Sequence, residues 1–209
     1  MPLDFQQVHE HLNLVTPRRN KFFREMEALA GRKDFPIIGP LVGRFLFQLA
    51  RITRAKRVFE LGSGFGYSAL WFAMGMPPGG KVYCTDTDPE NMKLAISFFK
   101  QAKQSHKLIF QIGDAVKILS KTAGKYDLML NDIDKKDYPK ALKVALPKLK
   151  KGGILISDNL LRDGSIFTNP LDADSRGILT YTKGIYSDKA LFSTIMPIRD
   201  GISLSLKIQ

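Results

Sequence analysis

Short apolar runs alternate with amphipathic segments along the chain from residue 56 onwards. Apolar runs bounded by turn residues are typical of buried strands, whereas apolar residues at every third or fourth position are typical of helices. We expect strands at residues 57–61, 81–85, 108–112, 126–130, 154–157, 191–196 and 202–208. We expect helices between them at residues 67–76, 89–103, 115–120 and 138–149.

Strands that alternate with helices are typical of a doubly wound, mostly parallel α/β sheet with right-handed crossovers. The last two predicted strands are joined by a segment that contains Asp200-Gly201, and Asp-Gly is a turn signal of β-hairpins. The expected fold class is therefore a Rossmann-like, seven-stranded sheet that ends in an antiparallel hairpin. On the helix at 89–103 we expect Met92, Ile96 and Phe99 to form one buried stripe.

The first 55 residues are predicted to be helical. Thr16-Pro17 has the pattern of a helix start, since Thr is a good cap and Pro is favoured in the first turn. We expect this helix to end at Gly31 and a second helix to follow Pro40. Because the sequence shows no linker, repeat or low-complexity tract, we expect one domain over residues 1–209, with a helical extension at 1–55 and an α/β core at 56–209.

The composition is that of an ordinary soluble globular protein, with 44% apolar and 25% charged residues among 209. No apolar run approaches the roughly 18 residues that a membrane span needs, and the N-terminus shows no basic stretch followed by an apolar one. Cys84 is the only cysteine and cannot form an intrachain disulfide. We therefore expect a reduced, cytoplasmic setting without membrane contact.

The net charge is +12, from 32 Lys and Arg against 20 Asp and Glu. Such a charge is compatible with an RNA partner or an acidic substrate. The basic residues are dispersed along the sequence and are not interleaved with aromatic residues. This favours solvated surfaces as the simpler interpretation of the charge.

A glycine-rich turn, Gly62-Ser63-Gly64-Phe65-Gly66, lies between the first predicted strand and helix, which is the context of a nucleotide-binding turn. The dinucleotide fingerprint places its third glycine one position later, where this chain has Tyr67. An adenosyl cofactor without phosphates has less need of that spacing. Asp86 ends the next predicted strand, 20 residues after Gly66, where its carboxylate could accept hydrogen bonds from a ribose.

Two more residues near this turn bear on the cofactor. Glu60, at the end of the first predicted strand, could accept a hydrogen bond from a ligand ammonium group. Two carboxylates facing the cofactor, Glu60 and Asp86, favour a sulfonium cofactor with an amino-acid end over NADP. Ser68 could bind the carboxylate of that amino-acid end, although helix capping explains this serine almost as well. A purely structural strand-to-helix turn is the simpler alternative.

Carboxylate and amide side chains follow two further predicted strands. Asp132 comes after the fourth strand, and Asp158 and Asn159 come after the fifth. The carboxyl ends of parallel strands meet at one edge of a sheet, so we expect these side chains to lie together. Hard oxygen ligands suit Mg²⁺ or Ca²⁺, and three of them leave about three of six octahedral positions open. The alternative is a charged loop in the first case and a cap or turn in the second.

Two vicinal substrate oxygens and one water would fill the open positions. Chelation lowers the pKa of a hydroxyl group, as a metal does for bound water. Lys135, three residues after Asp132, could then take the proton. The resulting oxyanion would attack a methyl group held in line, and most of the rate would come from positioning.

At these residues the chain resembles the cation-dependent O-methyltransferases, the group that contains catechol and caffeoyl-CoA O-methyltransferases. The resemblance runs from about residue 39 to the C-terminus, and its motifs lie at residues 59–68, 86–89, 132–138, 157–159 and 196–201. It implies a seven-stranded fold that binds S-adenosylmethionine, usually as a homodimer.

The resemblance also implies roles for individual residues. Asp132, Asp158 and Asn159 would hold the metal, with Mg²⁺ favoured and Ca²⁺ or Mn²⁺ as alternatives. Lys135 and Asp132 would be the catalytic residues, with Lys135 as the base. The residues expected at the cofactor are Glu60, Gly62, Ser63, Gly64, Gly66, Ser68, Asp86, Asp114, Ala115 and Asp132. Of these, Asp114 and Ala115 would lie near the adenine.

The acceptor is less constrained, because the chain departs from the family there. Leu160-Leu161 follows Asn159 where family members often have an aromatic residue, and residues 32–40 match the catechol and caffeoyl-CoA members poorly. Our first expectation is methyl transfer to a hydroxyl of a vicinal-dihydroxy, catechol-like small molecule. A 5-hydroxyuridine in tRNA is the alternative with the same chemistry, and a nucleotide-dependent oxidoreductase is the alternative from another class.

Overall fold

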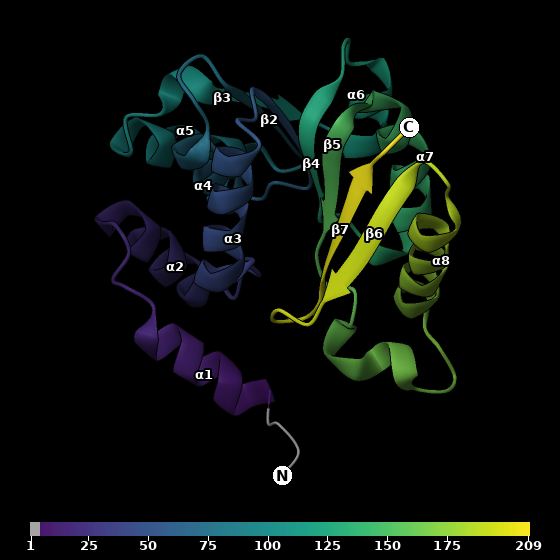
Figure 1. The fold of residues 1–209 in the computed structure, drawn as a ribbon. Helices are drawn as coiled ribbons and strands as arrows, with labels where there is room; N and C mark the ends of the chain where they lie inside the picture. The colour runs from purple at the N-terminus through teal and green to yellow at the C-terminus, as the bar shows by residue number, and fades with distance from the viewer. Residues whose placement is uncertain (1–4) are drawn as a thin grey trace.

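The computed structural model describes residues 5–209 and is built around one sheet of seven strands (Figure 1). The strands are β1 (Arg57–Leu61), β2 (Lys81–Asp86), β3 (Leu108–Ile112), β4 (Tyr126–Asn131), β5 (Leu149–Ser157), β6 (Leu191–Met196) and β7 (Ile202–Lys207). Their order in the sheet is β3-β2-β1-β4-β5-β7-β6, and β1 to β5 are parallel. The predicted fold class is thus confirmed.

The C-terminal hairpin is also confirmed, and it enters the sheet in a particular way. β7 runs antiparallel to both of its neighbours, β5 and β6. Ser157 at the end of β5 pairs with Ser203 near the start of β7. The turn at residues 197–201 therefore lies beside the carboxyl end of β5.

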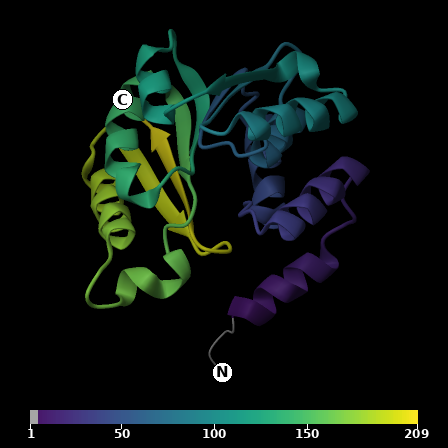
Figure 2. The same cartoon turned by 180° about the vertical axis from the view of Figure 1, so that it is seen from behind.

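Helices cover both faces of the sheet (Figures 1 and 2). One face carries α3 (Gly39–Ile52), α4 (Tyr67–Gly75) and α5 (Pro89–Gln101), and the other carries α6 (Ala115–Lys121), α7 (Tyr138–Lys148) and α8 (Ala173–Ser187). Short 3₁₀ turns occur at η1 (Ser105–Lys107), η2 (Lys135–Asp137) and η3 (Arg162–Phe167).

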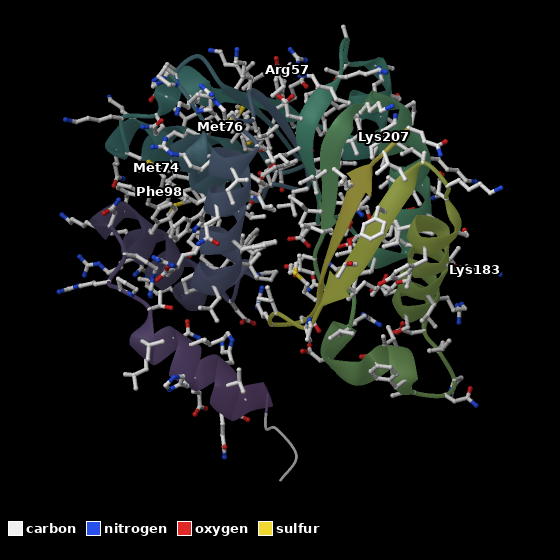
Figure 3. The ribbon with its side chains drawn as sticks, in the orientation of Figure 1. Arg57, Met74, Met76, Phe98, Lys183 and Lys207 are labelled. Carbon is white, nitrogen blue, oxygen red and sulfur yellow. The ribbon has the colours of Figure 1, made fainter. Side chains whose placement is uncertain are left out.

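Alternate strand residues pack into two separate cores, as the pleat of a strand requires. Leu128 and Leu130 of β4 belong to the core under α3, α4 and α5, whereas Met129 belongs to the core under α6 and α7. Figure 3 labels Met76 and Phe98 in the first of these cores, on the side of α4 and α5. In open α/β sheets with both faces covered, ligands bind at the carboxyl ends of the parallel strands.

Two N-terminal helices, α1 (Phe5–Val15) and α2 (Lys21–Lys33), precede α3. Phe23 of α2 stacks on Trp71 of α4 with ring centroids 3.9 Å apart. The Tyr67 hydroxyl donates a hydrogen bond to Glu27 of α2 at 2.7 Å. These contacts fix α2 against the helix that follows the glycine turn. No helix within residues 5–209 is long and apolar enough to cross a membrane.

The predicted helix start at Thr16-Pro17 is wrong. The Thr16 hydroxyl and N–H both donate to the Leu12 carbonyl, so this threonine closes α1 instead of capping the next helix. α2 begins at Lys21 and passes through Gly31 without ending there. It ends at Lys33, where Asp34 takes a left-handed conformation with φ 49°.

The predicted stripe on α5 is also wrong in part. Phe99 is buried, but Ile96 is 49% exposed, because α5 faces the sheet through Ala95, Phe98 and Phe99. The small Ala95 allows α5 to approach the glycine turn, since it lies against Gly66. α8 was not predicted at all, because glycine, serine and threonine interrupt the apolar residues in its sequence.

Candidate active site

A pocket of about 720 Å³ lies at the carboxyl ends of β1, β2, β4 and β5. Its walls come from the glycine turn after β1, the ends of β2 and β3, the loop after β4, the end of β5 and the β6–β7 turn. Residues 35–38, between α2 and α3, form the remaining wall. In open α/β sheets, ligands bind at this edge.

The glycine turn is packed closely against the loop that follows β4. Gly62 has φ 79°, which favours glycine, and a Cβ there would lie 2.5 Å from the Asp132 carbonyl oxygen. A Cβ at Gly64 would lie 2.8 Å from the ring of Phe35. Side chains at these positions would therefore push apart the walls of the pocket.

Asp86, at the end of β2, is held in one orientation by three hydrogen bonds. Its Oδ2 accepts from the Gly64 N–H at 3.0 Å, and its Oδ1 accepts from the Asp88 N–H at 2.8 Å and the Asn91 amide at 3.1 Å. An ionised carboxylate has room for about four donors, so Asp86 can still accept hydrogen bonds from the pocket. A fixed carboxylate of this kind suits a diol such as that of a ribose.

Glu60 lies behind the turn and does not line the pocket. Complete burial raises its pKa to about 8, and the Ser68 and Ser63 hydroxyls offset only part of this effect. Its Oε1 has no hydrogen-bond partner among the described residues. At neutral pH the folded protein therefore keeps this carboxyl group protonated.

The three candidate metal ligands do lie together. Asp132 and Asp158 follow the adjacent strands β4 and β5, and both line the pocket with Asn159. The Asp158 side chain is only 2% exposed, and its burial, with the nearby charge of Asp132, raises its pKa to about 7. Asn159 donates its amide N–H to Asp200 at 2.9 Å, which leaves its carbonyl oxygen as the free side-chain atom.

Lys135 lies beside this acidic group, as the spacing predicted. Its Nζ donates to Asp132 Oδ1 at 2.9 Å and lies 5.6 Å from the centre of the Tyr138 ring. About a fifth of its side chain is exposed, so it is neither sealed off nor free in solvent. A close packing of η2 on Gly177 of α8 fixes its backbone, because a Cβ at that glycine would collide with the Lys135 carbonyl.

Eleven of the predicted site residues line this one pocket: Gly62, Ser63, Gly64, Ser68, Asp86, Asp114, Ala115, Asp132, Lys135, Asp158 and Asn159. Glu60 and Gly66 do not, because Glu60 is buried behind the turn and Gly66 faces Ala95 and Phe99 of α5. Among residues 5–209 we find no cluster of three or more His, Cys, Asp or Glu that could hold a metal ion. The three candidate metal ligands do not form such a cluster, because the third of them, Asn159, carries an amide side chain.

Sequence reasoning gave no role to three residues that shape the site. The Tyr138 hydroxyl bonds the main-chain carbonyls of Asn131 at 3.2 Å and Asp158 at 3.0 Å, and so ties the ends of β4 and β5 together. Arg199 and Asp200 reach the site from the β6–β7 turn. The motifs at 132–138 and 196–201 contained these residues, but no local pattern showed where their side chains would lie.

Comparison with known proteins identifies a family that this chain matches. A family model described as "O-methyltransferase" matches residues 22–208. Tricin synthase 2 from Oryza sativa subsp. japonica is 30% identical over 226 residues, covering 99% of this chain and 76% of that protein. Caffeoyl-CoA O-methyltransferase from Medicago sativa is 29% identical over 211 residues, covering 93% of this chain and 85% of that protein.

Solved structures with the same fold include two O-methyltransferases. One, from Bacillus cereus in complex with SAH, has a TM-score of 0.87 at 22% identity and covers 96% of this chain and 97% of its own. The other, TomG from Streptomyces achromogenes in complex with SAM, has a TM-score of 0.88 at 21% identity and covers 97% of this chain and 96% of its own. At these identities the likeness establishes the fold.

Proposed function

Because the chain belongs to the O-methyltransferase family, we propose that it transfers a methyl group from S-adenosylmethionine to one hydroxyl of a vicinal-dihydroxy, catechol-like small molecule, with a divalent metal ion. The observation that carries the proposal is the placement of the glycine turn, Asp86, Lys135 and the Asp132–Asp158–Asn159 group around one pocket. Family membership decides against the alternative of a nucleotide-dependent oxidoreductase.

For the cofactor, we assign the half of the pocket formed by the glycine turn, Ser68, Asp86 and the Asp114-Ala115 segment. Asp86 would accept hydrogen bonds from the ribose, and Asp114 and Ala115 would lie beside the adenine. Ser68, at the start of α4, would bind the carboxylate of the amino-acid end. Glu60 would support the site from behind, through the Ser63 and Ser68 hydroxyls that lie next to it.

The acidic half of the pocket fits a divalent cation. Two carboxylates and an amide oxygen are hard ligands, and the raised pKa of Asp158 reflects burial and repulsion that a cation would offset. Asp132, Asp158 and Asn159 would hold Mg²⁺, with Ca²⁺ or Mn²⁺ as alternatives. The ion would supply Lewis acidity toward the hydroxyl groups of the acceptor.

The protein's own residues would then do the rest of the chemistry. Lys135 in its neutral form would take the proton from the reacting hydroxyl, and the walls of the pocket would hold this oxygen in line with the methyl group. The oxygen–carbon bond forms as the carbon–sulfur bond breaks, and the electron pair stays on sulfur to give S-adenosylhomocysteine. We further propose that residues 1–209 act as one domain in a cytoplasmic homodimer.

The proposal is tested by calorimetry and by methyl-transfer assays with 3,4-dihydroxybenzamide as the acceptor. We expect S-adenosylmethionine to bind, the diol to bind only when Mg²⁺ is present, and a chelator to abolish transfer reversibly. Asp158→Ala should lose the metal-dependent binding. The matched control is Asp134→Ala, because Asp134 also lines the pocket but its side chain is 78% exposed. Transfer that survives the chelator, or full activity in Asp158→Ala, would contradict the proposal.

A further inference from the structure

Arg199 reaches the pocket from the turn between β6 and β7. It lines the same pocket as Asp158 and Asn159, and its side chain is one third exposed. Its backbone has φ 53°, a left-handed conformation that glycine adopts with less strain. The chain therefore accepts a small conformational cost at a position that carries a cation into the pocket.

The guanidinium group of Arg199 makes no hydrogen bond to the residues that the structure describes, although its charge lies near the Asp158 carboxylate. Lys135 and Lys140, two other cations of the pocket, donate to Asp132 at 2.9 Å and to Asp137 at 2.6 Å. Arg199 only approaches Asp158, with NH1 3.7 Å from Oδ2, which is too long for a hydrogen bond. Among residues 5–209 it has no hydrogen-bond partner, so its five N–H donors remain available.

Hydrogen bonds and close packing hold the turn that presents Arg199 against the loop after β5. The Asp200 carboxylate accepts from the Asn159 amide at 2.9 Å and from the Asp163 N–H at 2.6 Å. The Leu160 N–H donates to the Gly201 carbonyl at 2.9 Å, and a Cβ at Gly201 would lie 2.6 Å from Leu161. The turn is thus fastened to the loop after β5, and the backbone of Arg199 lies beside the acidic group.

We propose that Arg199 binds a carboxylate substituent of the acceptor, so that the substrate is a vicinal diol that also carries a carboxylate. This inference rests on the proposed function and adds a second contact that holds the acceptor in the pocket. The planar guanidinium fork matches a carboxylate in two parallel hydrogen bonds. A doubly charged phosphate fits less well, because the aspartates that line the pocket would repel it more strongly.

Arg199 could instead serve only to balance the buried charge of Asp158. The two roles differ in what they do to ligands of different charge. A charge-balancing arginine affects all diols equally, through the metal and Asp158. An arginine that binds the acceptor discriminates between a charged and a neutral diol of the same shape.

The test compares 3,4-dihydroxybenzoate with 3,4-dihydroxybenzamide, which have nearly the same shape but differ in charge. Their dissociation constants are measured by calorimetry with Mg²⁺ and S-adenosylhomocysteine present, so that no turnover occurs. We expect the wild type to bind the benzoate about tenfold more tightly than the benzamide. Arg199→Gln should abolish this preference, and Arg199→Lys should keep only part of it.

The control variant is Arg54→Gln, since Arg54 is also an arginine with positive φ, at 52°, but does not line the pocket. It should keep the full preference for the benzoate. Equal affinities of the wild type for both ligands would overturn the inference, as would an Arg199→Gln variant that weakens both equally. If neither diol binds in the presence of metal, the proposed function itself fails, which is a distinguishable result.

Discussion

Glu60 and Asp158 are two buried carboxyl groups with raised pKa values that differ in their surroundings. Asp158 faces Arg199 and accepts a hydrogen bond from the Asn159 N–H, whereas Glu60 has an oxygen without any hydrogen-bond partner among the described residues. Burial without compensation costs stability once a group must ionise. Ionisation of either carboxyl group therefore lowers the stability of the folded protein. A bound ligand or a neutral replacement of the residue can reduce this loss.

Replacing Glu60 with Gln should change how stability depends on pH. Between pH 4.5 and about 8, unfolded wild type releases the Glu60 proton while the folded protein keeps it, so wild-type stability falls as pH rises. The free energy of unfolding of Glu60→Gln minus that of wild type should increase across this window, by at most about 1.4 kcal/mol per pH unit. Urea unfolding of the metal-free proteins measures it, and parallel curves would contradict it.

If Asn159 binds a metal ion as proposed, Asp200 should orient its side chain for that role. In Asp200→Asn, the new amide can donate as well as accept, so the Asn159 amide is no longer forced to turn its oxygen toward the pocket. We expect Mn²⁺ affinity, measured by titration without substrate, to fall about tenfold. Asp163→Asn removes the same charge from an exposed side chain nearby and should change little. An equal loss in both variants would indicate a long-range charge effect.

For residues that directly follow a strand, the sequence could predict a place in the candidate site. For residues that reach the site from distant segments, it could not. Asp132 and Asp158 directly follow apolar strands, so their meeting at one edge follows from the parallel sheet. Arg199 and Asp200 lie about 40 residues further along the chain, and only the pairing of β7 with β5 brings them to Asn159. Nothing local to residues 197–201 specifies that pairing.

At the scale of elements, α8 shows how a helix without a strong apolar pattern can still shape the site. It packs on η2 through Gly177, and this close approach holds the backbone of Lys135. Amphipathic periodicity could not reveal α8, because the faces that it buries include Ser175 and Gly177 as well as Ile178 and Tyr181. Small residues permit close packing without producing a hydrophobic pattern.

Gly177→Ala should therefore impair catalysis and stability, although helix propensity alone favours Ala over Gly. The new Cβ would collide with the backbone of Lys135 and Lys136, which cannot move aside as a flexible side chain can. We expect a lower kcat for methyl transfer and a loss of about 1–3 kcal/mol of stability. Gly184→Ala is the matched control in α8, since its Cβ would meet only the end of the Leu142 side chain, 2.9 Å away. If both variants behave alike, the packing of η2 on Gly177 is not important for Lys135.

At the scale of the whole molecule, the +12 charge is the property that bears on RNA as an alternative acceptor. Several lysines lie away from the pocket, such as Lys183, which is exposed on α8 (Figure 3). Others are used within the fold, such as Lys107, whose Nζ donates to the carbonyls of Ala73 and Met76. Because six aspartates and four basic residues line the pocket, the positive charge of the protein is not concentrated there.

We expect tRNA to bind only weakly, with a dissociation constant no tighter than about 10⁻⁶ M at physiological salt, as for non-specific electrostatic binding. It should not inhibit methylation of a small diol at that salt concentration. Fluorescence anisotropy over a series of salt concentrations measures the binding. Tight binding by tRNA that carries 5-hydroxyuridine, with inhibition of the small-molecule reaction, would favour the RNA acceptor instead.

The insertion of β7 between β5 and β6 has a consequence for how the protein is made. β6 is synthesised first, but within residues 5–209 it pairs with β7 alone, so it cannot join the sheet until β7 has left the ribosome. Arg199 and Asp200 reach the pocket through that same late step. A nascent chain that already holds the glycine turn and both aspartates therefore still has an open wall at its pocket. On this topology, the pocket gains its last wall only with the last strand of the sheet to emerge.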